Sequence, residues 1–179
     1  MARVGAKVPG YGVLCVIGFI LSLVALFTPG WRSYKGTGAP DLGLVSRNCG
    51  SGDRQVNSQD CARWAKHLMP FEKTTLAFMI LACIFEFFCV GFFFALFKTR
   101  SSAGKPAFTC CFLSFVCLFI SLIVYGVNMQ SKTVYMQSST YQLLANVYLG
   151  YSYWITLVST FIMLIATGIS GGFIGNQAE

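Results

Sequence analysis

The sequence predicts an all-α membrane fold, a bundle of four transmembrane helices with a small extracellular β-sheet formed mainly by the first loop. Composition indicates a membrane protein, because 55% of the residues are hydrophobic and 11% are charged, whereas soluble domains are about one-quarter charged. Four nearly uncharged runs each hold about 20 residues or more, enough to cross a hydrocarbon core of about 30 Å. These runs are 8–28, 76–97, 107–127 and 149–175, and we assign 1–179 to a single transmembrane domain.

The first run admits a second interpretation, a cleaved signal peptide. Arg3 and Lys7 precede it and Ala25 lies near its end, which is the general pattern of such a leader. The run is long for a leader, however, and Pro29 and Trp31 stand where a small-residue cleavage site belongs. We therefore favour four spans, while the alternative would leave three.

The orientation follows from the charges of the connecting segments. The short loop 98–106 carries three basic residues and no acid, and the N-terminal stub carries two basic residues and no acid. Basic short segments stay on the cytoplasmic side, so we expect both termini in the cytoplasm of a multi-pass plasma-membrane protein. Loops 29–75 and 128–148 are then extracellular. Loop 29–75 has seven basic and four acidic residues, but long loops carry less weight in this rule.

Two cysteines support this orientation. Six of the eight cysteines lie in or at the edges of spans, whereas Cys49 and Cys61 share loop 29–75. A pair isolated in one polar loop is typical of a disulfide in an oxidising compartment, and closing a ring of about 13 residues stabilises by about 3 kcal/mol in the chain-entropy model. The alternatives are two free thiols or half of a metal site with His67 as a single further ligand. We expect no metal and no cofactor.

Loop 29–75 also predicts local structure. Short apolar alternations between Gly- and Pro-rich turns, such as residues 42–46, indicate short strands of a small sheet. Between Asp60 and Met69 the pattern becomes helical, with Asp60 as N-cap and Pro70 as the residue that ends the helix.

The order of these features resembles the claudin, peripheral-myelin-protein and epithelial-membrane-protein superfamily, whose first loop carries a W, GLW, C, C signature. The likeness covers the whole chain at the level of topology and is most like an invertebrate claudin-like protein, such as one from a nematode. The residues that match the signature are Trp31, Gly43, Leu44, Cys49 and Cys61.

Three features depart from the family pattern. Val45 stands in place of the second signature Trp, the spacing from Gly43 to Cys49 is longer by about one residue, and the tail reads "NQAE" instead of a PDZ-binding motif. These departures weaken a junctional scaffolding role more than they weaken the fold. Loop 128–148 is short and has no cysteine, which excludes tetraspanins, connexins and innexins.

Glu86 lies in the middle of the second span. A carboxylate at this depth costs about 2.5 kcal/mol or more, so we expect its side chain to face the bundle. The favoured interpretation is a neutral carboxylic acid hydrogen-bonded to Ser114, Ser121 or Tyr125 of the third span. The alternative is an ion or proton pathway, which usually needs several ionisable residues.

Two further observations concern the other spans. Cys110 and Cys111 lie one turn into the third span, on the predicted cytoplasmic side, where they are candidates for S-palmitoylation or are inert buried thiols. Ser22 is assigned to close packing of the first helix.

No catalytic constellation is present in the sequence, which holds one histidine and neither a P-loop nor a dinucleotide fingerprint. We therefore predict a protein that is not an enzyme. The net charge of +7 is spread over loops beside a bilayer, where basic residues meet membrane lipids and not nucleic acid.

The resemblance implies an integral membrane protein of cell–cell contacts or an epithelial barrier, which acts through disulfide-stapled extracellular loops. Its expected partners are itself or other claudin-like proteins. The alternative is an auxiliary subunit of an ion channel or receptor, and a weaker alternative is a small transporter that depends on Glu86.

Overall fold

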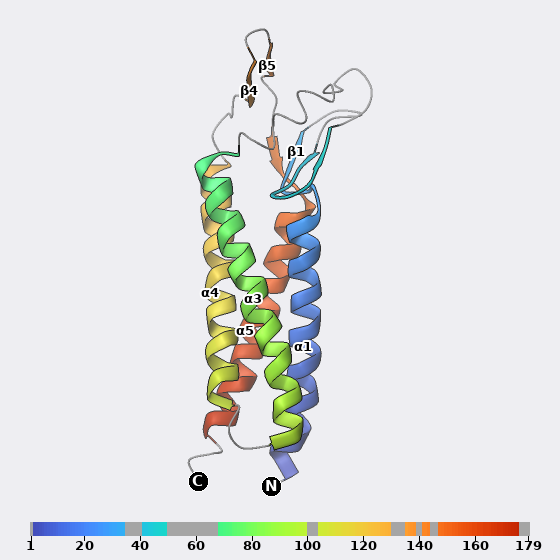
Figure 1. Ribbon diagram of the computed structural model, residues 1–179, viewed down its shortest axis with the longest axis vertical. Coiled ribbons are helices and arrows are strands. Elements are labelled where there is room, and N and C mark those ends of the chain that lie inside the picture. Colours follow the sequence, from blue (N-terminus) through green and yellow to red (C-terminus); the bar gives the residue numbers. More distant parts are fainter. Residues whose placement is uncertain are drawn as a thin grey trace.

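The computed structural model shows a four-helix bundle with a small sheet at one end (Figure 1). The structure describes residues 2–34, 41–49, 68–99, 104–129, 135–138, 141–143 and 147–175. The helices of this part are α1 (Ala2–Phe27), α3 (Pro70–Thr99), α4 (Gly104–Asn128) and α5 (Tyr151–Gly175).

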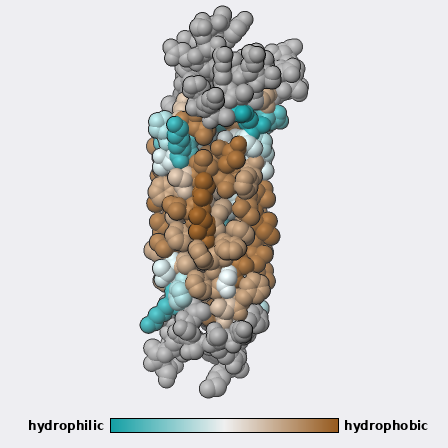
Figure 2. Space-filling view, viewed as in Figure 1, coloured by the Kyte–Doolittle hydropathy of each residue, from teal (hydrophilic) through white to brown (hydrophobic). Residues whose placement is uncertain are grey.

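Each helix contains a stretch long and apolar enough to cross a membrane. These stretches are Val8–Phe27, Pro70–Leu96, Gly104–Asn128 and Tyr151–Phe173. On the face that Figure 2 shows, hydrophobic side chains form a broad band across the middle of the molecule, with hydrophilic groups toward its ends. The predicted fold class, four spanning helices with a small sheet, is confirmed.

Large apolar side chains cover the outside of this bundle, and small or polar ones fill much of its inside. Phe87 and Phe94 are 63% and 64% exposed, whereas Ser22, Ser114 and Ser159 are fully buried. Lipid supplies little hydrophobic drive between helices, so close packing and hydrogen bonds through small residues hold such bundles together.

Helix α3 begins earlier than the hydropathy of the sequence indicates, at Pro70 and not near residue 76. Proline suits the first position of a helix because its missing N–H is not needed there. The Glu72 Oε2 atom accepts a hydrogen bond from the Met69 N–H at 2.9 Å, which is the return bond of a capping box. Pro70 is therefore the first residue of α3, where the sequence predicted only the end of an earlier helix. Most of the predicted helix from Asp60 to Met69 lies outside the described residues.

The sheet combines two segments that are far apart in the chain. Strand β1 pairs with β2, and β2 with β3, while β6 comes from the connection between α4 and α5 and pairs antiparallel with β1. The strand order is thus β3-β2-β1-β6, and strands β4 and β5 form a separate hairpin. The strands are β1 (Arg32–Tyr34), β2 (Asp41–Leu42), β3 (Arg47–Asn48), β4 (Tyr135–Ser138), β5 (Tyr141–Leu143) and β6 (Val147–Leu149).

All these strands lie at one end of the bundle, which we call the sheet end (Figure 1). Helix α1 begins and helix α5 ends at the opposite end, which we call the terminal end. Helix α3 ends and helix α4 begins at the terminal end as well (Figure 1).

Candidate functional site: the sheet and its seat on the bundle

The side chain of Trp31 anchors the sheet to the helices at the sheet end of the bundle. Its side chain is fully buried, and its Nε1–H donates to the Ala25 carbonyl at 2.7 Å. The indole packs edge-on against Tyr125 of α4 and Tyr153 of α5, at centroid distances of 4.9 and 6.3 Å. Phe71 of α3 packs in turn against Tyr125 at 5.6 Å. We call Trp31, Phe71, Tyr125 and Tyr153 the aromatic cap, because they join the sheet to three helices.

The backbone of Trp31 also links the two loop segments. Its N–H donates to the Leu42 carbonyl at 3.1 Å, and its carbonyl accepts from the Gly150 N–H at 3.1 Å. Both loops are therefore hydrogen-bonded to the residue whose side chain anchors them.

A buried ion pair ties β1 to α3. The Arg32 Nη2 atom donates to the Glu72 Oε1 atom at 2.8 Å, and the two side chains are 0% and 5% exposed. The guanidinium also lies 5.7 Å from the centre of the Phe71 ring, within cation–π range. Because Glu72 also accepts from the Met69 N–H, one carboxylate connects the strand to the first turn of α3.

The sequence interpretation missed this pair, because it counted Arg32 and Glu72 as loop charges. The available signal was Pro70 followed two positions later by Glu72, the residue types of positions N1 and N3 of a helix.

A second junction joins the end of α1 to the start of α5. The Ser152 hydroxyl lies 2.7 Å from the Thr28 hydroxyl and accepts from the Gly30 N–H at 3.1 Å, and the Ser152 N–H donates to the Gly30 carbonyl at 2.8 Å. A Cβ at Gly30 would collide with the Tyr151 ring, and one at Gly150 would collide with the Gly30 carbonyl. The two segments can cross this closely because both residues are glycine.

The Gly43–Leu44 pair turns the chain back onto the end of α1. The Gly43 N–H donates to the Ser46 carbonyl at 2.9 Å, and the Ser46 hydroxyl donates to the Phe27 carbonyl. A Cβ at Gly43 would lie 2.5 Å from the Thr28 carbonyl oxygen, so a side chain does not fit. Leu44 is 4% exposed, whereas Val45 is 54% exposed.

Glu86 connects all four helices in the middle of the bundle. It is fully buried, and its Oε1 atom accepts from the Ser22 hydroxyl of α1 at 3.0 Å and from the Ser114 hydroxyl of α4 at 3.2 Å. Ser22 in turn lies 2.9 Å from the Ser159 hydroxyl of α5, which donates to the Gly18 carbonyl at 3.0 Å. These contacts place a polar network where the helices meet.

Ser114 is one of the three partners that the sequence suggested for Glu86. The other two lie elsewhere, since Ser121 donates to the Cys117 carbonyl and Tyr125 belongs to the aromatic cap. The serine of α1 was missed as a partner, because a hydropathy pattern does not show which faces of separate helices meet.

A comparison with protein families matches the model described as "Tight junction protein, Claudin-like" over residues 1–103. This match covers more than half of the 179 residues. The chain belongs to the claudin-like family. A comparison with curated proteins finds no match. This claudin-like protein is a multi-pass membrane protein, and the matched region holds α1, the first loop and α3.

The predicted disulfide involves one cysteine inside and one outside the described residues. In this claudin-like protein Cys49 takes part in a disulfide. Cys61 lies outside the described residues, so its pairing with Cys49 stays a prediction, and His67 also lies outside them. Within the described part, no group of three or more His, Cys, Asp or Glu side chains is placed to hold a metal ion.

The two cysteines suggested for palmitoylation have different environments. Cys111 is fully buried between helices, whereas Cys110 is partly exposed. Acylation needs an accessible sulfur, so the prediction stays open for Cys110 and loses support for Cys111.

Proposed function

We propose that this claudin-like protein is a non-enzymatic component of cell–cell contacts or of an epithelial barrier, and that it acts through the sheet end. The observation that carries this proposal is the shared sheet, in which β6 of the second loop pairs with β1 of the first. Two loops built into one sheet present one surface instead of two independent ones.

Rigid attachment suits such a surface to association. The aromatic cap and the buried pair of Arg32 and Glu72 hold the sheet on the helices. A preorganised surface loses less conformational entropy on binding than flexible loops do. Self-association, or association with other claudin-like proteins in the same or an apposed membrane, follows as the proposed mode of action.

The sheet end is proposed to be extracellular in the plasma membrane, with both termini cytoplasmic. Lys98 lies in the last turn of α3 and Lys105 in the first turn of α4, at the terminal end of the bundle (Figure 1), and basic residues beside the ends of spans favour the cytoplasm. A disulfide between Cys49 and Cys61 would then form in an oxidising compartment.

The proposal is tested by expressing the full chain in cells that lack junction proteins. We expect cell aggregation and intramembrane strands in freeze-fracture replicas. The substitution Val45→Ser should reduce cell aggregation without changing the amount of protein at the cell surface. Val158→Ser is the matched control, because Val45 and Val158 are 54% and 52% exposed but Val158 lies in the span of α5. Absence of both aggregation and strands at full surface expression would rule out the proposal.

The second candidate is an auxiliary subunit of an ion channel or receptor, and Val45 favours it. A small, half-exposed valine stands at the place of the second signature Trp, so the surface differs from that of the family pattern. Crosslinking and mass spectrometry of native membranes separate the two candidates. Self-contacts at the sheet end support the contact protein, whereas a foreign channel or receptor in fixed stoichiometry supports the auxiliary subunit.

A small transporter is the weakest candidate, because it depends on Glu86 alone. It would require loss of flux in a folded Glu86→Gln variant.

A further inference from the structure

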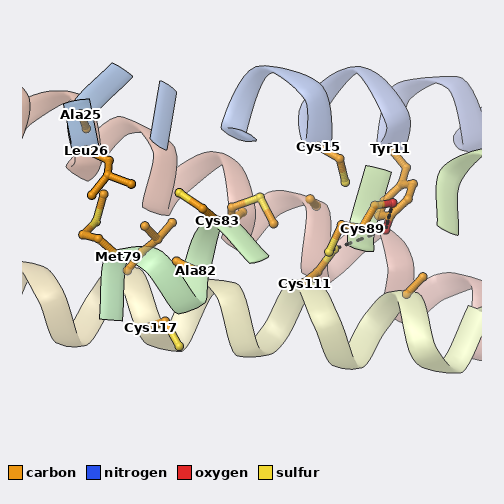
Figure 3. Packing of buried hydrophobic residues seen from close by; sticks show 14 of the residues in the cluster. Tyr11, Cys15, Ala25, Leu26, Met79, Ala82, Cys83, Cys89, Cys111 and Cys117 are labelled. Atoms are coloured by element: carbon orange, nitrogen blue, oxygen red, sulfur yellow. Dashed lines mark hydrogen bonds between the residues drawn. The ribbon is translucent and has the colours of Figure 1, made fainter. Parts of the chain in front are cut away.

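Three cysteines from three different helices are buried inside the bundle, and the proposed function uses none of them. Cys15 comes from α1, Cys89 from α3 and Cys111 from α4, and each is fully buried. The Cys111 Sγ donates to the Cys89 Sγ at 3.0 Å, and Cys15 belongs to the same buried cluster of side chains. We call these residues the thiol cluster (Figure 3).

Tyr11 completes the surroundings of the thiol cluster. Its hydroxyl lies 3.3 Å from the Cys111 Sγ and donates to the Cys89 carbonyl at 3.4 Å. The Tyr11 ring packs edge-on against Phe173 of α5 at a centroid distance of 5.7 Å. Tyr11 of α1 therefore contacts both Cys89 of α3 and Cys111 of α4, and α5 packs against the Tyr11 ring.

This arrangement differs from that of ordinary buried cysteines. Cys83 and Cys117 are also nearly buried, at 8% and 7% exposure, and Figure 3 shows both apart from the thiol cluster. A cysteine that only fills space needs no second sulfur within hydrogen-bond distance. The contact between the thiols of Cys89 and Cys111, from two different helices, therefore points to sulfur chemistry.

Metal binding is the less favourable chemistry here. Thiol ligands must lose their protons to bind a metal, which would leave negative charge at membrane depth, where charge is costly. The described residues also hold no three-ligand arrangement suited to a metal ion. A disulfide, by contrast, is neutral and can be buried among apolar side chains at no electrostatic cost.

We propose that Cys89 and Cys111 are an oxidation site for membrane-permeant hydroperoxides, which join them in a disulfide between α3 and α4. One sulfur attacks the peroxide, so that an S–O bond forms and the O–O bond breaks. The thiol proton passes to the leaving alkoxide, which departs as an alcohol. The second sulfur then attacks the sulfenic acid, forming the S–S bond and releasing water. The peroxide is reduced by two electrons and the two thiols are oxidised by two.

The distance supports this pair. A disulfide bond is about 2.05 Å long, so the sulfurs of Cys89 and Cys111, now 3.0 Å apart, need to approach by about 1 Å. Helices α3 and α4, which carry the two cysteines, are consecutive in the chain and pack against each other. The burial of the pair within the spans explains the choice of oxidant, because a charged oxidant would not enter this depth.

The test uses the full-length protein in lipid vesicles, treated with tert-butyl hydroperoxide and then denatured and alkylated. Intact mass and peptide mapping count the remaining thiols. We expect two thiols to be lost together, with a crosslinked Cys89–Cys111 peptide, while Cys83 and Cys117 stay alkylatable as internal controls. Full alkylation of Cys89 and Cys111 after treatment would overturn the proposal. Equal loss at Cys83 and Cys117, or a different crosslinked pair, would overturn it as well.

Discussion

The ion pair of Arg32 and Glu72 allows a specific prediction about how the sheet is attached to the helices. In Glu72→Ala, Arg32 keeps its charge in a site that is fully buried and loses a partner that lies 2.8 Å away. Removing one member of a buried pair costs about 3–5 kcal/mol. The variant also loses the oxygen that accepts from the Met69 N–H, and a lost helix cap costs about 1 kcal/mol.

The assay is the free energy of unfolding of the full chain, measured by reversible titration with sodium dodecyl sulfate in mixed micelles. Glu72→Gln is the matched variant, because its amide oxygen still accepts from the Met69 N–H while the charge is gone. It should lose the ion pair but keep the cap. Lys73→Ala, at an exposed neighbouring position, should change stability by about 0.5 kcal/mol or less. A cost below about 1 kcal/mol for Glu72→Ala would match an exposed pair and would contradict a stabilising role of the buried pair.

Three further substitutions test the contacts on which the account depends, each by the same unfolding titration. Trp31→Ala should cost about 3–5 kcal/mol, while Trp154→Ala, with a side chain 54% exposed on the bundle surface, should cost far less; equal costs would contradict the anchoring role of the indole. Gly43→Ala should destabilise the protein, because the added Cβ would collide with backbone atoms. Gly172→Ala should be tolerated, because a Cβ there has open space around it. If neither variant changed the stability, the tight turn at Gly43 would be contradicted. Glu86→Ala should lower the free energy of unfolding by about 1–3 kcal/mol, because it leaves buried hydroxyl groups without a hydrogen-bond partner. Glu86→Gln should lower it less. A Gln variant as unstable as the Ala variant would count against the hydrogen-bond network.

The parts of the fold that could be predicted depend on composition within a single segment. An uncharged run of spanning length predicts a helix wherever it occurs, so the four spans followed directly from hydropathy. The position of Glu86 inside the bundle followed from the cost of a carboxylate in lipid.

The parts that could not be predicted depend on how separate segments meet. Ser22 reaches Glu86 because of the relative rotation of α1 and α3, and no pattern within either helix determines that rotation. The same holds for the thiol cluster. Strand β6 was not predicted, because it is three residues long and directly precedes a helix. Its pairing with β1 determines its conformation more than its own residue types do.

The proposed extracellular orientation of the sheet end can be measured by labelling of thiols in intact cells. Val45→Cys places a thiol at an exposed position of the sheet end, and Lys105→Cys places one at an exposed position of the terminal end. With a membrane-impermeant maleimide and the unsubstituted chain as background, Val45→Cys should be labelled in intact cells and Lys105→Cys only after permeabilisation. Labelling of Lys105→Cys in intact cells, with Val45→Cys protected until permeabilisation, would contradict the proposed orientation.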